Sequence, residues 1–557
     1  MNWKETAVGY EIYPYSFLDS NGDGYGDLKG ILEKLDYLQE LGVDLLWLCP
    51  VYVSPRDDNG YDVADQKHVD PLLGSDEDLE RLIEEVHQRG MHILLDLVLN
   101  HVSKEHYWFQ EAIKSKDDPY HDYFLFRDPL IINGKKCPPN HWQGFFSTSV
   151  WTYVPQLDQY YFHIFAESMP DLNWQNEEVR REIKAIARYW LEKGIDGFRL
   201  DAAAHLAKDW SFRDPEEPLN DLGLIYHTDS FSNRPENFLF LKELKEDVFD
   251  HYDCLCIGEV GGCASTQLAK QYADRKYGVF DMVFNFDTCW ENGAYGSVHK
   301  SDEEISLDVV NLKKNFLRWY DDCAESCEMP LYWLNHDHPR VLSQYGNKKY
   351  RRKSGKMLEG ILLFLYGLPF LYQGEELGLL NVDYEEPEDF FAEVGDRNFV
   401  TSHPELSKEV LLRYLRRCSR LNGRAPLPWT AGKNAGFSSG TPYLKMTGDS
   451  QEVYAEKEVR DPDSIYHFVK RAITLRKEHN EAARYGKLEI RDIEDPELFV
   501  YTKETAKEKL LVIANMKETQ REMRLPADAV LLLSNTEEAR KGDLLQIGAY
   551  DFYLYRI

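Results

Sequence analysis

The chain has 557 residues, 43% of them hydrophobic, which is enough for more than one folded core and excludes wholesale disorder. It carries 65 basic and 96 acidic residues, a net charge of −31 that disfavours nucleic-acid and anionic-membrane partners. No run approaches the roughly 18 apolar residues of a membrane span, and the first ten residues lack the pattern of a secretory signal.

Apolar segments typical of buried parallel strands alternate with amphipathic segments typical of helices. The strands are predicted at 8–14, 43–51, 92–100, 197–203, 255–260, 281–286, 330–335 and 369–373. Helical patterns between them include Leu28–Leu41, Asp76–Arg89 and Glu177–Lys193. Eight strands separated by helices predict an α/β fold, a closed (β/α)8 TIM barrel.

Two segments depart from this alternation. The connection after the third strand is too long for an ordinary loop and is rich in aromatic residues, so we expect an inserted subdomain at 102–171. After about residue 480 the pattern changes to short strands with turn residues between them, which predicts a C-terminal antiparallel β-sandwich at 481–557. The barrel is then formed by residues 1–101 and 172–480.

Nine cysteines are scattered along the chain without the paired spacing of a zinc site. Cys49, Cys254 and Cys256 fall inside predicted core strands. We therefore expect reduced thiols in a cytoplasmic protein. For the oligomeric state we expect a monomer or a weak homo-oligomer.

The loop after the first strand has the pattern of a cation site. Asp19, Asn21, Asp23 and Asp27 occupy positions 1, 3, 5 and 9 of an EF-hand-type loop, with glycine at position 6 and Tyr25 at position 7. Position 12 is glycine instead of a bidentate glutamate, which excludes a true EF-hand. A polar βα turn is the simpler interpretation, but the combined matches favour a structural Ca²⁺ or Mg²⁺ site.

Four strands end in charged residues, within Asp96–His101, Gly197–Asp201, Gly258–Glu259 and Asn335–His338. Each charge alone is typical of a strand-end salt bridge or a cap. Together they indicate that one mouth of a barrel collects ionisable groups, as in enzymes of this architecture.

Three of these residues are the carboxylates Asp201, Glu259 and Asp337, and such a group suits glycoside cleavage. Arg199 lies two residues before Asp201 on the same strand face, where it can orient Asp201 as an ionised nucleophile. The apolar residues before Glu259 favour a role as the acid. His101 and His336 are candidates to donate hydrogen bonds to sugar hydroxyls.

These motifs resemble glycoside hydrolase family 13, the α-amylase family, and its oligo-1,6-glucosidase and α-glucosidase branch. The resemblance runs from about residue 5 to the C-terminus and rests on the four strand-end segments. It also rests on the loop 19–27 and the segments 58–61, 372–376, 422–429 and 434–437.

The resemblance implies a retaining mechanism in which Asp201 is the nucleophile, Glu259 the general acid and base, and Asp337 the residue that grips the sugar hydroxyls. His101, Arg199 and His336 would line the glucose subsite. Asp58 and Arg420 would close it, which makes the enzyme exo-acting. Tyr61 would stack under the ring, with Phe165 nearby; a core aromatic is the less favoured interpretation of Tyr61.

Three positions depart from the branch: Met169 replaces a glutamine, Leu421 replaces an aspartate beside Arg420, and Ala202 follows the nucleophile. Members selective for α-1,6 links generally carry valine at the last position. We therefore expect an α-glucosidase that accepts α-1,4 links of maltose-type oligosaccharides, with α-1,6 links open.

Several alternatives share the scaffold. A transglycosylase or sucrose isomerase differs in the acceptor of the glucosyl group, and a trehalose-6-phosphate hydrolase needs a basic pocket, for which the run 348–353 is a weak candidate. A non-enzymatic relative such as a transporter heavy chain is disfavoured because all three carboxylates are present and no anchor is found. A simple carbohydrate-binding module is also disfavoured, because it would not need the three carboxylates.

Overall fold

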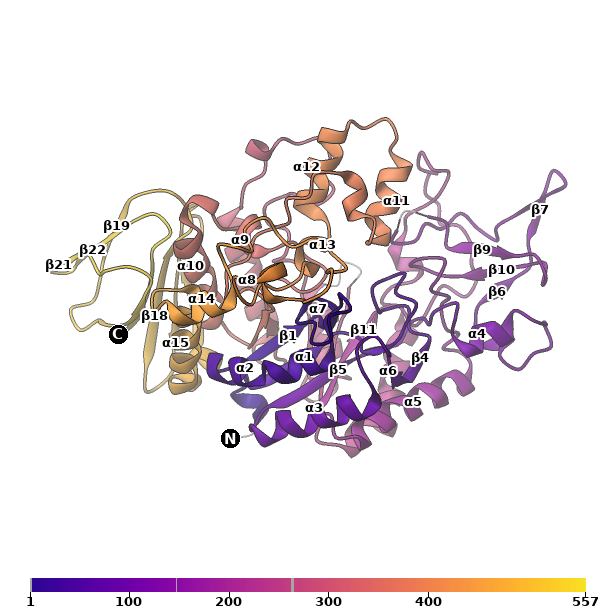
Figure 1. Ribbon diagram of the computed structural model, residues 1–557, viewed down its shortest axis with the longest axis horizontal. Coiled ribbons are helices and arrows are strands. Elements are labelled where there is room, and N and C mark those ends of the chain that lie inside the picture. The colour runs from indigo at the N-terminus through magenta and orange to yellow at the C-terminus, as the bar shows by residue number, and fades with distance from the viewer. Residues whose placement is uncertain (1–2, 147, 262–264) are drawn as a thin grey trace.

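A computed structural model describes residues 3–146, 148–261 and 265–557. Its centre is a ring of eight parallel strands surrounded by helices, which confirms the predicted fold class (Figure 1). The strands are β1 (Gly9–Ile12), β2 (Leu45–Leu48), β5 (His92–Val98), β11 (Gly197–Asp201), β12 (Leu255–Gly258), β13 (Met282–Val283), β14 (Pro330–Leu331) and β15 (Leu368–Tyr372). A parallel bridge between Met282 and Glu328, just before β14, closes the ring.

The helices that cover the barrel follow the expected alternation. They include α1 (Leu28–Glu33), α2 (Leu35–Leu41), α3 (Asp76–Gln88), α5 (Glu177–Glu192), α6 (Pro235–Asp247), α7 (Thr266–Ala273), α8 (Val309–Cys323), α10 (Arg351–Leu363) and α15 (Ile465–Glu478). In α3 the Ser75 side chain accepts a hydrogen bond from the Asp78 amide, a capping box that starts the helix. None of the described helices is long and apolar enough to cross a membrane.

The single helix expected at Leu28–Leu41 is wrong. Lys34 leaves the helical region with φ −108° and ψ 6°, so α1 and α2 are separate short helices. The apolar pattern is continuous across the break because Ile31 and Leu35 are both fully buried. Apolar periodicity reports the buried face of each turn and not a local change of backbone direction.

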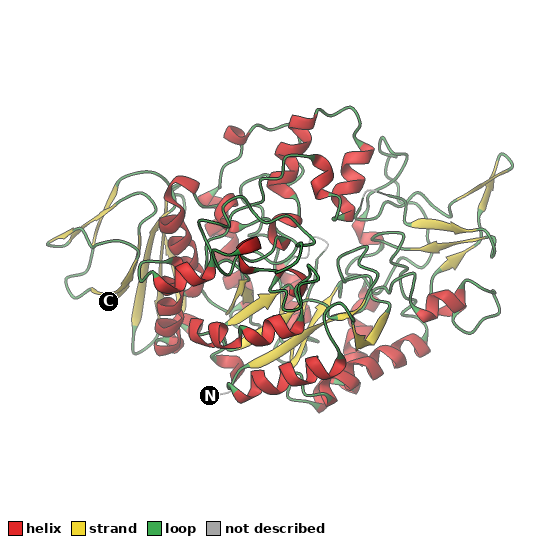
Figure 2. Cartoon of the chain, viewed as in Figure 1, coloured by secondary structure: helices red, strands yellow, loops and turns green. Residues whose placement is uncertain are grey.

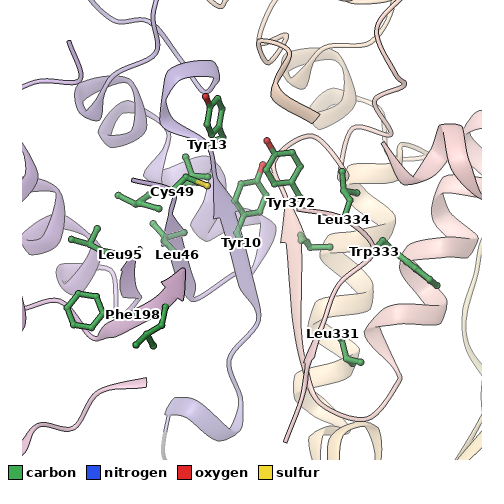
Figure 3. Close-up of a cluster of buried hydrophobic side chains, with 14 of the residues drawn as sticks. Tyr10, Tyr13, Leu46, Cys49, Leu95, Phe198, Leu331, Trp333, Leu334 and Tyr372 are labelled. Carbon is green, nitrogen blue, oxygen red and sulfur yellow. The ribbon is translucent and has the colours of Figure 1, made fainter. Parts of the chain in front are cut away.

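Alternation along the barrel strands separates two sets of side chains. Tyr10, Leu46, Leu95 and Phe198 face the layer between strands and helices, and Figure 3 shows them with Tyr372 and Trp333 in this core. Trp47, Leu94, Ile257 and Phe370 belong to a second cluster inside the barrel. Because successive strand residues face opposite ways, the inner positions continue into charged residues at the carboxyl ends of the strands.

Two further sets of strands lie at opposite ends of the molecule, as Figures 1 and 2 show. One set lies between β5 and α5 and contains β6 (Phe126–Arg127), β7 (Leu130–Ile132), β8 (Lys135–Cys137), β9 (Trp151–Val154) and β10 (Gln159–Phe162). The other packs as two antiparallel sheets, one of β16 (Lys487–Arg491), β17 (Leu498–Glu504), β18 (Lys509–Asn515), β23 (Phe552–Arg556) and β20 (Val530–Ser534), the other of β19 (Arg521–Arg524), β22 (Leu544–Ile547) and β21 (Arg540–Lys541).

Buried lysine side chains connect both sets of strands to the barrel. Lys208 is fully buried and pairs with Asp171 at 2.7 Å, and it also donates to the Asn100 side chain at 2.7 Å. Lys313 of α8 donates to the backbone carbonyl oxygens of Asp492, Asp495 and Leu498 at 2.8–3.0 Å. These contacts stabilise a buried charge by surrounding it with acceptors.

Shorter elements complete the chain, and several of them border the mouth of the barrel. They are β3 (Tyr52–Val53), β4 (Asp65–Val69), α4 (Tyr107–Ala112), α9 (Val341–Gln344), α11 (Val394–Ser402), α12 (Lys408–Cys418), α13 (Leu421–Arg424) and α14 (Ala455–Arg460). The eight cysteines of the described residues have free thiols, and the ninth, Cys263, lies outside them.

Candidate active site

The centre of the barrel mouth is a buried guanidinium. Arg199 on β11 is 1% exposed. Its Nη1 donates to Asp96 at 2.7 Å and to Asp201 at 2.6 Å, and its Nη2 lies 2.8 Å from Glu259 Oε2. The guanidinium also lies over the ring of Trp47 at 5.4 Å. One cation therefore holds three carboxylates from three neighbouring strands.

Asp201 and Glu259 are adjacent in this arrangement. Glu259 Oε2 accepts a hydrogen bond from the backbone amide of Ala202 at 3.0 Å. Burial raises the pKa of Asp201 well above its ordinary value, Arg199 opposes the shift, and the negative charges of Glu259 and Asp96 add to it. The guanidinium therefore offsets part of the cost of ionising this buried carboxyl group, but the pKa of Asp201 stays above its ordinary value.

Asp337 lies in a cationic pocket instead. Its carboxylate contacts Arg424 at 2.8 Å, Arg420 at 3.1 Å and His336 Nε2 at 3.2 Å. Burial opposes ionisation, but the imidazole and the two guanidinium groups hold the pKa of Asp337 well below the ordinary carboxyl value. Asp337 is therefore ionised across the working range of most enzymes.

The two predicted imidazoles differ in charge. Burial disfavours a charged His336, but Asp337 raises the pKa of His336 well above its ordinary value. Its Nδ1 lies 2.7 Å from Glu11 on β1, so the imidazolium is held between two carboxylates. Burial lowers the pKa of His101 to about 4, so its ring is neutral at pH 7 and lies 3.2 Å from the backbone oxygen of Tyr61.

Aromatic rings border these groups. Tyr61 stacks on His336 with ring centroids 5.0 Å apart and planes 12° apart, and its hydroxyl donates to Asp96 at 3.2 Å. Phe165 contacts the ring of His101 with centroids 5.2 Å apart. Both aromatic residues line the same cavity as the carboxylates.

One end of the cavity is closed by ion pairs. Arg420 contacts Asp58 at 2.8 Å and also pairs with Glu393. Glu393 in turn contacts Arg424 at 3.0 Å, and it accepts a hydrogen bond from Asn59 at 3.2 Å. These contacts connect segments from distant parts of the chain on one side of the cavity, and we call Asp58, Glu393, Arg420 and Arg424 the closing wall.

The cavity has a volume of about 690 Å³, within the usual range of pockets that bind small molecules. All predicted substrate-site residues except Arg199 line it, and Arg199 lies directly beneath. The predicted residues that line it are Asp58, Tyr61, His101, Phe165, Asp201, Ala202, Glu259, His336, Asp337 and Arg420. Ala202 lines the cavity next to Asp201 in the chain and has a left-handed backbone, with φ 50°.

Residue-level reasoning on the sequence missed two fully buried acidic groups that contact predicted site residues, Glu11 and Glu393, which are each 1% exposed. Glu11 could have been found from its place at the carboxyl end of β1, since a buried glutamate there matches the pattern of the other strand ends. Glu393 precedes a short helix in a segment without strand pattern, so no sequence signal points to it.

The predicted metal residues lie apart from the cavity, in the loop before α1. Asp19 and Asp27 are buried, and the donors to Asp19, Asp23 and Asp27 are uncharged amide and hydroxyl groups. The oxygen-only donor set fits a hard cation, and the charge of the three carboxylates has no cationic side chain against it among the described residues.

The basic run at 348–353 also lies away from the cavity. Lys349 pairs with Glu518, Arg351 with Asp449 and Lys353 with Asp551. None of the six residues lines the cavity at the barrel mouth. The run therefore connects the barrel to the C-terminal strands and to a neighbouring loop.

Comparison with known proteins agrees with this arrangement. Residues 11–486 match the family model described as Alpha amylase, catalytic domain. The chain is 40% identical over 550 residues to an oligo-1,6-glucosidase from Heyndrickxia coagulans, which covers 98% of each chain.

Two solved structures are similar over the whole chain. A trehalose-6-phosphate hydrolase from Bacillus licheniformis has a TM-score of 0.91 at 36% identity, with 100% of this chain and 99% of that chain covered. The trehalulose synthase from Pseudomonas mesoacidophila MX-45 has a TM-score of 0.93 at 34% identity, with the same coverage.

The closing wall generates a stability prediction. Glu393→Gln removes the carboxylate from the buried guanidinium of Arg424 and the partly exposed one of Arg420, and we expect a loss of about 3–5 kcal/mol in the free energy of unfolding. Urea denaturation measures this loss. The control is Glu386→Gln, whose partner Lys408 is as exposed as itself; equal stability of the two variants would contradict a structural role for Glu393.

Proposed function

The chain belongs to the α-amylase family of glycoside hydrolases, and we propose that it is a retaining, exo-acting α-glucosidase that hydrolyses terminal α-glucosidic bonds of short oligosaccharides. The observation that carries this proposal is the contact of Asp201 and Glu259 with one guanidinium at the base of a cavity closed at one end. A retaining mechanism needs two carboxyl groups close together, and a shared cation keeps them so.

In this mechanism Asp201 attacks the anomeric carbon while Glu259 gives a proton to the leaving oxygen. The covalent glucosyl-enzyme is then hydrolysed by a water from which Glu259 removes a proton. Asp337, ionised between two arginines, accepts hydrogen bonds from sugar hydroxyls, and His336 donates them. The carboxylates at the barrel mouth also favour the positive charge that develops on the sugar ring in the transition state.

The closed end supports exo action. Asp58 and Arg420 both line the cavity and form an ion pair at 2.8 Å. With the terminal sugar ring over Tyr61 and its non-reducing end against this pair, the pair would block a further unit on that side. The same pair can hydrogen-bond the terminal 4-hydroxyl group of the substrate. Cleavage would then release one glucose at a time.

The charge of the cavity supports a neutral substrate over a phosphorylated one. The cationic side chains among the described residues that line it are Arg420 and the imidazolium of His336. The acidic lining residues are Asp58, Asp201, Glu259, Asp287, Asp337, Glu393 and Asp396. A dianionic phosphate would be repelled, so trehalose-6-phosphate is the less favoured substrate although a relative of that name has a similar fold.

Ala202 supports acceptance of α-1,4 links. Its methyl group leaves space beside the nucleophile, where a branched side chain would approach the leaving sugar. The oligo-1,6-glucosidases among the relatives support α-1,6 links as a second substrate class. Transfer of the glucosyl group to a sugar instead of water is the alternative that product analysis distinguishes.

We also propose that the loop 19–27 binds Ca²⁺ or Mg²⁺ through Asp19, Asn21, Asp23, Asp27 and the backbone oxygen of Tyr25. Such an ion would neutralise the carboxylates and stabilise the loop. The free thiols support a cytoplasmic location. The net charge of −31 disfavours nucleic-acid and membrane partners and supports a monomer or weak homo-oligomer.

The first prediction from this proposed function concerns linkage. Wild type should hydrolyse maltose faster than it hydrolyses trehalose-6-phosphate, and Ala202→Val should lower the ratio of maltose to isomaltose turnover. Because valine is strained at φ 50°, the ratio of kcat/KM values is the readout and thermal unfolding is the control for folding. An unchanged ratio would contradict the role of Ala202, and undiminished activity in Asp201→Asn would reject the mechanism.

The second prediction concerns pH. Since burial and neighbouring carboxylates raise the pKa of Asp201, the nucleophile loses its charge at a higher pH than an ordinary aspartate. Glu259→Gln removes one of these charges, so the acid limb of glucosyl-enzyme formation should move to lower pH. Burst kinetics with α-glucosyl fluoride, whose leaving group needs no acid, measure this step. Glu246→Gln on the exposed face of α6 is the control, and a limb that moves upward refutes the assignment.

The third prediction concerns the metal. Removal of divalent cations with a chelator should lower the unfolding temperature, and Ca²⁺ or Mg²⁺ should restore it by mass action. Asp19→Asn should lose this response to cations. If chelation leaves the wild-type unfolding temperature unchanged, the loop is held by its own hydrogen bonds alone.

A further inference from the structure

Two neighbouring aromatic residues, Trp290 and Tyr295, line the main cavity. Trp290 and Tyr295 lie on the loop after β13, with ring centroids 5.0 Å apart and planes 41° apart. Tyr295 is 68% exposed, and both rings line the same cavity as the catalytic carboxylates. We call these two side chains the outer platform.

The outer platform is continuous with the site. The ring of Trp290 lies 5.6 Å from that of His338, which directly follows Asp337 in the chain. Burial lowers the pKa of His338 to about 4, so this ring is neutral at pH 7. The strand that precedes the platform loop, β13, pairs with β12, whose end carries Glu259. The platform therefore extends from the side on which the leaving group is protonated.

A second hollow continues this path. It has a volume of about 380 Å³ and shares His403 with the main cavity. Its lining begins at Gly296, next to Tyr295, and includes the polar residues Ser297, His299, Lys300 and Glu405. A linear ligand that leaves the main cavity past Tyr295 would enter a groove with hydrogen-bonding groups.

The main chain of the loop is held by contacts other than the ring of Tyr295. Arg417 on α12 donates to the backbone oxygens of Ser297 at 2.9 Å and Lys300 at 3.0 Å. Cys418 donates to the backbone oxygen of Ala294 at 3.4 Å. The ring of Tyr295 contributes little packing because it is highly exposed. Since the main chain is anchored to α12, the platform is preorganised for a ligand.

We propose that Trp290 and Tyr295 form a stacking site for the second and third sugar rings of a neutral linear oligosaccharide, on the leaving-group side of the bond that is cleaved. This inference rests on the proposed function and adds chain length to it. Flat aromatic faces match the apolar faces of pyranose rings, and the polar groups beyond Tyr295 match the hydroxyls of a third ring.

The test compares three substrates that differ in what lies beyond the cleaved bond. Maltotriose has two further rings, maltose has one, and α-glucosyl fluoride has none. In Tyr295→Ala and in Trp290→Ala, the ratio of kcat/KM for maltotriose to that for α-glucosyl fluoride should fall roughly 3- to 10-fold for each ring removed, which is the strength of one aromatic contact. Tyr295→Phe should restore the wild-type ratio because it keeps the ring.

Tyr277→Ala is the matched control, since Tyr277 is 69% exposed and lines neither hollow. Its ratio should equal that of wild type. The proposal is overturned if both alanine variants keep the wild-type ratio, or if Tyr277→Ala lowers it equally. If wild type hydrolyses none of the three substrates, the proposed function fails instead.

Discussion

The burial of one guanidinium is the constraint on which the site depends. Arg199 lies inside the barrel, and removing such a charge from water costs several kcal/mol unless opposite charges surround it. Asp96, Asp201 and Glu259 supply those charges from the ends of β5, β11 and β12. The contacts that make the buried cation stable are thus the ones that bring the two proposed catalytic carboxyl groups together.

Three carboxylates around one cation leave an excess of negative charge at the barrel mouth. The surroundings of Asp337 are cationic instead, because this carboxylate contacts Arg420, Arg424 and an imidazolium. The floor of the cavity is therefore acidic, and beside it lies an ionised carboxylate, Asp337, that can bind sugar hydroxyls. This arrangement suits a reaction in which positive charge develops on a neutral sugar. The same field is unfavourable for phosphorylated ligands, so the electrostatics that assist the chemistry also restrict the substrate class.

The barrel and the main strand ends could be predicted because each rests on a local pattern. Continuous apolar runs indicated the eight strands, and all eight are present with shifted boundaries. Same-face spacing also predicted that Arg199 and Asp201 would face the same way. Local pattern gave no warning of the break at Lys34, since the apolar spacing of α1 and α2 continues through it.

By itself the sequence determined the fold class, the family and the residues at the strand ends, because strand alternation specifies which side chains face the barrel interior. Only the tertiary structure decided which of those groups share a partner. Glu11 meets His336 across 325 residues, and Asp58 meets Arg420 across 362. Glu393 belongs to the closing wall, and the outer platform borders the leaving-group side. Both positions are set by loops whose paths depend on barrel closure and on the packing of α11 and α12. Such contacts carry no sequence period, so they become visible only when the ring of strands is closed.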